Sequence, residues 1–220
     1  MAAASPVVNT HKTTTETNMI ISHQHQFIFV KTRKTAGSTL EYLLHTRLGE
    51  QDICTGSETD GTPRTNTENT QGHTPWQEIA EQYPREWQNY YKFTIERNPW
   101  EKTASAYQWH RVKNSKRYGD MSFEDYMSKA VKVLPRDWEL YSDTKGPVVD
   151  CVYQYSQMSE MYQDLNSRFG LDIQESEWHN TKLKCLDGEI TNHKQLHSMG
   201  TRLAVQPLFE REIEQFGYEY

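Results

Sequence analysis

Apolar residues gather in short runs along this chain, and amphipathic segments separate the runs. The segment QFIFVK (residues 26–31) is nearly all apolar between polar neighbours, which is typical of a central strand covered on both faces. The alternating apolar positions of YYKFTIE (90–96) predict a second strand, and GPVVDCVYQY (146–155) predicts a third. Because helical patterns follow these strands, the order indicates an α/β protein.

The predicted helices have recognisable starts and ends. The first, over about 38–48, has leucines at helical spacing and stops at Gly49. Three further helices are expected to begin at capping residues: Thr74 with Pro75 in the first turn, Asn98 before Pro99, and Ser122. Another helix is expected from Ser156 to Phe169, with Gly170 at its end. The last helix is expected from about Pro207 to Phe216. We therefore expect a P-loop-like three-layer α/β fold with a central parallel sheet flanked by helices.

The ordered part of the chain is expected to form one domain over residues 19–220. Residues 1–18 are small and polar and predict a disordered tail without a signal peptide. Residues 50–72 contain almost no apolar side chains, and so long a connection is usually functional or disordered, which predicts a mobile loop that could act as a lid. No stretch approaches the length of a membrane span.

Charge and cysteine content narrow the classes of function. With 24 basic and 30 acidic side chains the net charge is −6, which argues against a nucleic-acid partner, so any anion site must be local. The cysteines are odd in number and widely spaced, which predicts neither a disulfide framework nor a zinc site. We expect a cytoplasmic protein with no metal and no membrane partner. His193 and His197 are one helical turn apart, but no third metal ligand is near them in sequence.

The first candidate site lies in FVKTRKTAGSTL (residues 29–40), between the first strand and its helix. Backbone amides in a turn that opens a helix form a positive nest, and the helix dipole adds to it, so a phosphate or sulfate fits there. Lys34 adds a full charge. The nucleoside-triphosphate loop GxxxxGK[ST] is the obvious alternative, but here the lysine precedes Gly37 by three residues and the first glycine is absent. Nucleotide hydrolysis is therefore poorly supported.

The second candidate site lies in FTIERNPWEKTASAY (residues 93–107), again in a strand, turn and helix context. Arg97 stands at the strand end, and Ser105 follows eight residues later in the helix. A guanidinium can bind a phosphate in bidentate fashion, and a hydroxyl can donate one more hydrogen bond. The helical rise from Pro99 to Ser105 is about 9 Å at roughly 1.5 Å per residue, which lies within the combined reach of an extended arginine and a phosphate.

These two segments resemble the nucleotide-binding elements of sulfotransferases, which use 3′-phosphoadenosine 5′-phosphosulfate (PAPS). The family's 5′-phosphosulfate loop commonly reads close to PKTAGTS, and KTAGST is similar to it. The resemblance puts Lys34 on the family's lysine, with Arg33 in place of the usual proline, and it implies that Arg97 and Ser105 bind the 3′-phosphate. The oxyanion cradle that it implies consists of Thr35, Ala36, Gly37, Ser38 and Thr39.

Weaker likenesses extend over most of residues 26–220. GHTPWQEI, WHNTK and EREIEQFGYEY resemble segments of bacterial and carbohydrate-type sulfotransferases. The chain departs from the family at one place, because Gln154 and Ser156 stand where many relatives have an arginine and a glutamate. Any role of those charges in nucleotide or acceptor binding is therefore in doubt here.

The resemblance implies transfer of the sulfuryl group to a hydroxyl, or alternatively an amine, of a saccharide or small metabolite. Lys34 would stabilise charge on the leaving phosphate. His73 is the expected base, since a helix N-terminus would disfavour its imidazolium, and His179 is the alternative. Tryptophans beside the motifs could stack on adenine or a sugar, although packing is the commoner role: Trp76, Trp100, Trp109 and Trp178. A nucleotide-dependent phosphotransferase and a non-catalytic PAPS-binding module are the rival interpretations.

Overall fold

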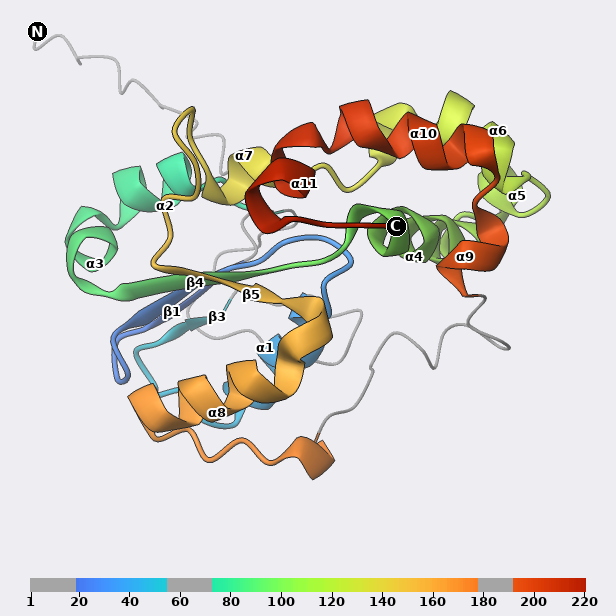
Figure 1. Ribbon diagram of the computed structural model, residues 1–220. Coiled ribbons are helices and arrows are strands. Elements are labelled where there is room, and N and C mark those ends of the chain that lie inside the picture. Colours follow the sequence, from blue (N-terminus) through green and yellow to red (C-terminus); the bar gives the residue numbers. More distant parts are fainter. Residues whose placement is uncertain (1–18, 55–72, 178–191) are drawn as a thin grey trace, which may run out of the picture.

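A five-stranded sheet forms the centre of the computed structural model, which describes residues 19–54, 73–177 and 192–220 (Figure 1). The strand order is β3-β1-β2-β4-β5. The parallel part contains β2 (Phe27–Val30), β4 (Tyr91–Glu96) and β5 (Cys151–Gln154), which are the three strands that the sequence predicts. Two strands missing from the prediction complete the edge: β1 (Met19–Ser22) is antiparallel to both β2 and β3 (Ile53–Cys54).

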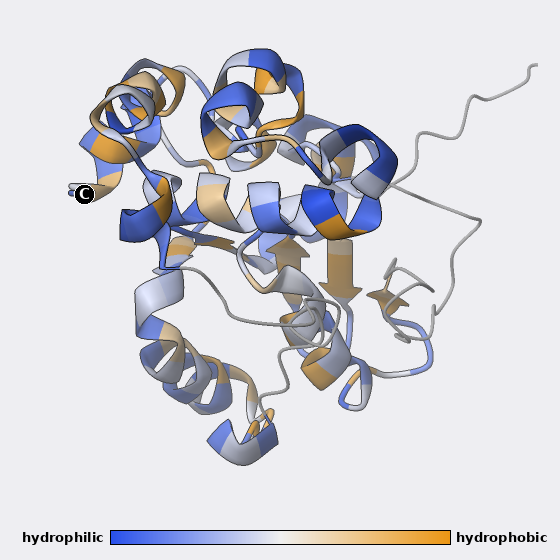
Figure 2. Cartoon of the chain, turned by 90° about the vertical axis from the view of Figure 1, so that its right-hand side faces the viewer, coloured by the Kyte–Doolittle hydropathy of each residue, from blue (hydrophilic) through white to orange (hydrophobic). Residues whose placement is uncertain are grey.

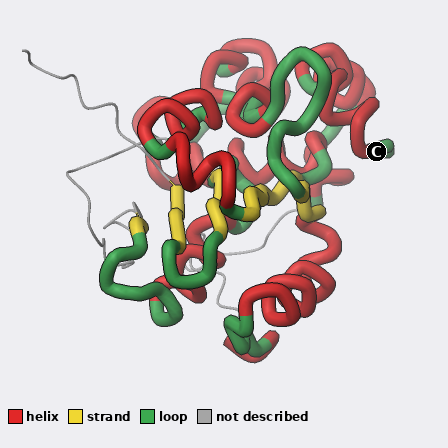
Figure 3. Tube along the Cα trace, turned by 90° about the vertical axis from the view of Figure 1, so that its left-hand side faces the viewer, coloured by secondary structure: helices red, strands yellow, loops and turns green. Residues whose placement is uncertain are grey.

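Helices cover both faces of the sheet, as Figures 1 and 3 show, which confirms the three-layer α/β prediction. On one side lie α1 (Gly37–His45) and α8 (Met158–Phe169). The other helices are α2 (Trp76–Gln82), α3 (Pro84–Asn89), α4 (Pro99–Lys113), α5 (Ser115–Tyr118), α6 (Phe123–Lys129), α7 (Trp138–Tyr141), α9 (His193–Leu196), α10 (Met199–Leu208) and α11 (Glu210–Phe216). Within the described ranges, none of these helices has both the length and the apolar character needed to cross a membrane.

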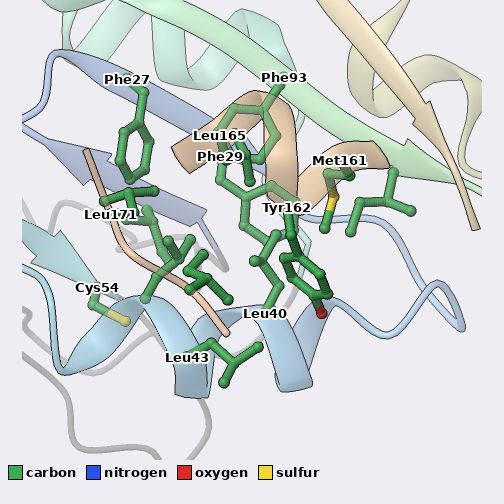
Figure 4. Close-up of a cluster of buried hydrophobic side chains, with 14 residues drawn as sticks. Phe27, Phe29, Leu40, Leu43, Cys54, Phe93, Met161, Tyr162, Leu165 and Leu171 are labelled. Carbon is green, nitrogen blue, oxygen red and sulfur yellow. The ribbon is translucent and has the colours of Figure 1, made fainter. Parts of the chain in front are cut away.

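The alternation of side chains along the strands divides the core into two faces. Phe27 and Phe29 of β2 pack with Phe93 of β4 against α1 and α8, and Figure 4 shows this cluster together with Leu40 and Tyr162. Ile28 and Val30 point to the opposite face, where they meet a second cluster that includes Ile79, Trp138 and Tyr141. The strand β2 is accordingly apolar on both sides, whereas β4 has the buried polar residues Thr94 and Glu96 opposite Phe93 and Ile95. The strands form the most hydrophobic band in Figure 2.

Local capping signals were predicted with mixed success. Asn98 accepts a hydrogen bond from the Trp100 amide at 3.0 Å, which confirms the start of α4, and Ser122 accepts one from the Asp125 amide at 3.1 Å. Gly170 ends α8 with a left-handed φ of 64°, also as predicted. The Thr74 prediction is wrong, because α2 begins after an extended Pro75, and the buried Thr74 hydroxyl makes no bond to it.

Two further predictions need correction or lie outside the described ranges. The last helix was expected over 207–216, but Pro207 lies inside the final turn of α10, and α11 begins only after a break at Phe209. Residues 50–54 of the predicted mobile loop include the short strand β3. The rest of that loop, residues 55–72, and the predicted tail over 1–18 lie outside the described residues.

Candidate functional site

A pocket of about 600 Å³ lies at the carboxyl ends of the three parallel strands. Its lining includes Lys31 and Thr32 after β2, Arg97 after β4 and Tyr155 after β5. This is the edge of a parallel α/β sheet where ligands usually bind. The predicted site residues that line the pocket are Arg33, Lys34, Ala36, Gly37, Ser38, Thr39, His73, Arg97 and Ser105. The structure therefore brings the two sequence motifs to one site.

Thr35 is the predicted site residue that does not line the pocket. Its side chain is fully buried, and its hydroxyl donates to the Thr32 carbonyl at 3.2 Å and lies 2.9 Å from the Thr32 hydroxyl. In this structure the hydroxyl therefore closes the turn and does not face the pocket. Only the backbone amide of Thr35 stays a candidate ligand.

The turn before α1 has the backbone of an anion-binding nest. Lys34 and Ala36 both have left-handed φ values, 63° and 64°, which cost a non-glycine residue about 1–2 kcal/mol each. Left-handed residues within such a turn bring successive N–H groups to one side. The first N–H groups of a helix also lack intrahelical partners, and here they belong to Gly37 and Ser38 at the pocket wall. This geometry supports the anion site that the sequence predicts.

Gly37 is required by a close approach between the turn and the side chain beneath it. A Cβ at this position would lie 2.8 Å from Cγ of Lys31. Lys31 cannot easily move, since it is buried and its ammonium pairs with the buried carboxylate of Glu41 on α1. No pattern in the sequence predicts this buried pair.

Arg33 lines the pocket, but its side chain is committed to the protein. Its Nε donates to one carboxylate oxygen of Asp137 at 2.6 Å, and its backbone N–H donates to the other at 2.7 Å. One terminal nitrogen also donates to the Arg136 carbonyl at 3.2 Å. The arginine that replaces the family's proline therefore fixes the turn through Asp137.

The second motif packs directly against the first. The guanidinium of Arg97 donates to the Lys34 carbonyl at 3.3 Å and to Glu101 at 3.2 Å, and it lies over the ring of Tyr155 at 4.0 Å. The ammonium of Lys34 lies 4.8 Å from the centre of the Trp109 ring on α4. Two cations from separate strand ends thus border one cavity, each backed by an aromatic ring.

His73 lies at the pocket wall with a defined tautomer. Its Nδ1 is 2.8 Å from the Lys31 carbonyl, which can only accept, so Nδ1 carries the hydrogen and the lone pair of the neutral ring is on Nε2. Burial lowers the pKa of His73 to about 4. The expected neutral form is therefore present, but desolvation is its main cause, since α2 begins only at Trp76. The alternative base, His179, lies outside the described residues.

The tryptophans and the two family-departure positions singled out in the sequence lie in different environments. Trp109 lines the pocket, whereas the indole N–H of Trp76 donates to Ser142 and that of Trp100 to Arg202, so these two rings serve packing. Trp178 lies outside the described residues. Gln154 accepts a hydrogen bond from Tyr218, and Ser156 is exposed beside the pocket edge. The departure from the family at these positions thus replaces two charges with neutral groups.

Several pocket residues were missed by the sequence analysis: Glu101, Gln108, His110, Lys132, Val133, Pro135, Tyr155, Asn192 and His193. Tyr155 could have been found, because it directly follows the third parallel strand and so belongs to the ligand-binding edge. His193 and His197 have different environments: His193 lines the pocket, whereas His197 is buried with Nε2 at 3.0 Å from the Trp100 carbonyl. No sequence signal distinguishes those two histidines.

A P-loop-like sheet with two strand–helix turns facing one pocket defines a class of proteins that bind phosphorylated or sulfated ligands. The model of the Sulfotransferase family matches residues 17–206, and the chain therefore belongs to the sulfotransferase family, whose enzymes transfer sulfuryl groups. No curated protein and no solved structure matches this chain.

Proposed function

We propose that this protein transfers the sulfuryl group of PAPS to a hydroxyl, or alternatively an amine, of a saccharide or small metabolite and releases 3′,5′-adenosine bisphosphate. The observation that carries this proposal is the convergence of the Lys34 turn and the Arg97 turn on one pocket, joined by a hydrogen bond of 3.3 Å. Membership of the sulfotransferase family supports the same chemistry.

Each turn suits one end of the nucleotide. The amides that follow Lys34 would bind the 5′-phosphosulfate, together with the Ser38 hydroxyl, which is buried and has no hydrogen-bond partner in the described part of the chain. Arg97 would pair with the 3′-phosphate, to which Ser105 donates a further hydrogen bond. Glu101 pairs with Arg97, which keeps that guanidinium oriented along the pocket wall.

Lys34 and His73 would carry the chemical step. The acceptor oxygen or nitrogen forms a bond to sulfur while the bond between sulfur and the bridging oxygen of the 5′-phosphate breaks. The proton of the acceptor would go to Nε2 of His73, which is unprotonated in the tautomer that the Lys31 carbonyl favours. The Lys34 ammonium would stabilise the negative charge that develops on the departing phosphate.

The acceptor would enter beside the 131–137 segment, which borders the first turn through the Arg33–Asp137 contact. Here Val133 and Pro135 offer apolar surface, and Lys132 is an exposed cation. Across the cavity, Trp109 presents an aromatic face of the kind that packs against sugar or aromatic rings. These groups are consistent with a small hydroxylated acceptor.

Transfer of radiolabelled sulfur from PAPS to a panel of saccharides, phenols and amines tests this proposal. We expect label in at least one acceptor class without added metal, and its loss in Lys34→Ala but not in Lys116→Ala, which removes an exposed lysine of α5. Binding of 3′,5′-adenosine bisphosphate without transfer to any acceptor would favour the non-catalytic module. Transfer of phosphate from ATP with magnesium would favour the phosphotransferase.

A further inference from the structure

Three buried charged side chains lie directly behind the pocket without lining it: Glu96, Lys102 and Asp137. Glu96 is the last residue of β4, and Lys102 lies in the first turns of α4. The Lys102 ammonium is 2.6 Å from Oε1 of Glu96 and 3.1 Å from Oδ2 of Asp137. All three are fully buried, so together they form an internal ion-pair network.

Both ends of this network hold the backbone of a predicted phosphate-binding turn. At one end, Oδ2 of Asp137 accepts the backbone N–H of Arg33 at 2.7 Å, next to Lys34. At the other end, Oε1 of Glu96 accepts the backbone N–H of Arg97 at 2.8 Å. The amides of two turns that are far apart in sequence are thus connected through Lys102.

The surroundings of the network keep Asp137 and Lys102 charged, whereas burial raises the pKa of Glu96. Burial alone would raise the pKa of Asp137, but Lys102 and Arg33 beside it hold that pKa below its usual value. Asp137 and Glu96 likewise raise the pKa of Lys102 despite its burial. The other groups that face the network are the Tyr141 hydroxyl, which donates to Glu96 at 3.0 Å, His73 beside Asp137, and the buried carboxyl of Glu212.

Such a network is an expensive way to stabilise a core, because each buried charge loses several kcal/mol of hydration and an apolar set of similar volume is often as stable. Its value is geometric: charged hydrogen bonds have preferred lengths and directions, and here they end on backbone amides. None of these three side chains lines the pocket, whereas Arg33 and Arg97, whose backbone N–H groups Asp137 and Glu96 accept, do.

We propose that Asp137, Lys102 and Glu96 form a positioning unit that fixes the Arg33–Lys34 turn relative to the Arg97 turn. A change at one turn is transmitted to the other through Lys102. In the proposed reaction, on which the functional part of this inference rests, the unit sets the distance between the group that binds the 3′-phosphate and the lysine that faces the leaving phosphate. The structural coupling itself does not depend on that reaction.

Amide hydrogen exchange in the unliganded protein tests the coupling directly. We expect Asp137→Asn, which keeps the side chain's shape, to increase exchange about tenfold at the distant amide of Arg97 as well as over residues 33–37, as the loss of about one net hydrogen bond would. Glu96→Gln should increase exchange over residues 33–37. Asp52→Asn is the matched control, since Asp52 is also buried and accepts the amides of His23, Gln24 and Gly49 away from the pocket. Changes confined to the mutated turn, or equal changes at all amides, would overturn the proposal.

A kinetic measurement tests the positioning role. Asp137→Asn should lower kcat by about 10- to 100-fold, the effect of a small misplacement, with KM for PAPS changed much less. The stoichiometry of bisphosphate binding gives the fraction of active protein, so that partial unfolding is not mistaken for a lower kcat. Asp137→Glu, which restores the carboxylate, should recover part of the rate. A normal kcat per active site in Asp137→Asn would contradict the role. If the wild type does not bind bisphosphate, the proposed function is contradicted. The exchange experiment would then still test whether the two turns are coupled.

Discussion

The guanidinium of Arg97 donates a hydrogen bond of 3.3 Å to the backbone carbonyl of Lys34, although 63 residues separate them in the sequence. The contact joins the two turns that the sequence motifs predict to hold opposite ends of one nucleotide. Arg97 therefore has a structural partner within the protein in addition to its proposed ligand. Substitution of Arg97 should therefore disturb the Lys34 turn as well as the proposed 3′-phosphate site.

The acid limb of the pH–rate profile should report His73. Burial lowers the pKa of His73 to about 4, so its ring stays neutral and able to accept a proton well below the usual value of 6.5. We expect kcat/KM to fall with a midpoint near pH 4, and His73→Gln to lower kcat by roughly 10²- to 10⁴-fold. His23→Gln, in the turn between β1 and β2, is the matched control. An acid limb near pH 6.5 would contradict the assigned state of His73.

Stability should depend on pH through His73 and Glu212 in opposite directions. Between pH 6.5 and 4 the unfolded chain binds a proton at His73 that the folded chain does not, so this group removes about 3 kcal/mol of the free energy of unfolding as the pH falls. Burial raises the pKa of Glu212 from 4.5 to about 7. The proton on Glu212 therefore stabilises the folded chain below pH 4.5, and this stabilisation is lost as the pH rises from 4.5 to 7. Chemical denaturation of His73→Gln and Glu212→Gln beside the wild type separates the two effects. A Glu212→Gln variant that gains no stability relative to the wild type between pH 4.5 and 8 would contradict the assignment.

Gly37→Ala should damage the anion site through Lys31. The added Cβ would lie 2.8 Å from Cγ of Lys31, whose displacement would disturb its buried pair with Glu41 beneath the turn. We expect the affinity for 3′,5′-adenosine bisphosphate to fall about tenfold or more, and a tenfold loss is equivalent to about 1.4 kcal/mol of binding free energy. Gly200→Ala in α10 meets only an ordinary contact at 3.8 Å and should leave that affinity unchanged while adding roughly 0.5–1 kcal/mol of stability. Equal affinities in the two variants would show that the close approach is unimportant.

Two helix caps of similar energy should differ in their effect on binding. Asn98→Ala and Ser122→Ala each remove a side chain that accepts an N–H in the first turn of a helix, which costs about 1 kcal/mol. Only Asn98 adjoins Arg97 and begins the helix that carries Ser105. Asn98 also donates a hydrogen bond of 2.7 Å to the Glu219 carbonyl. Thermal unfolding should therefore show a loss in both variants that is larger in Asn98→Ala, whereas titration with bisphosphate should show weaker binding in Asn98→Ala alone. Weaker binding in both variants would indicate a general loss of structure.

The parts of the fold that the sequence predicts are those with strong local signals. The apolar run before Lys34 and the Asn98–Pro99 start of α4 are set by neighbouring residues, and both are present. The strand β3 has only two residues, too few for a periodic pattern. The strand β1 is as long as β2, but its apolar run is only three residues long and directly follows the polar segment 1–18. Pro207 is typical of a helix start, yet it lies inside the final turn of α10, with helical residues on both sides of it.

The site residues that belong to a sequence motif could be predicted. Those whose role depends on burial in the tertiary structure could not. Lys34 and Arg97 belong to recognisable segments, and both line the pocket. Lys102 and Asp137 are charged residues that would ordinarily face solvent, and only the tertiary structure reveals that they are buried together. In the same way, Trp100 and Trp109 lie on one helix, but only Trp109 reaches the pocket.

The most direct test of the central claim is isothermal titration of the protein with 3′,5′-adenosine bisphosphate in the absence of metal. We predict binding in the micromolar range for the wild type and for Arg85→Ala, an exposed arginine of α3, together with loss of binding in Arg97→Ala and Lys34→Ala. Absence of bisphosphate binding in the wild type, alongside magnesium-dependent binding of ATP, would contradict the assignment of these two turns to PAPS.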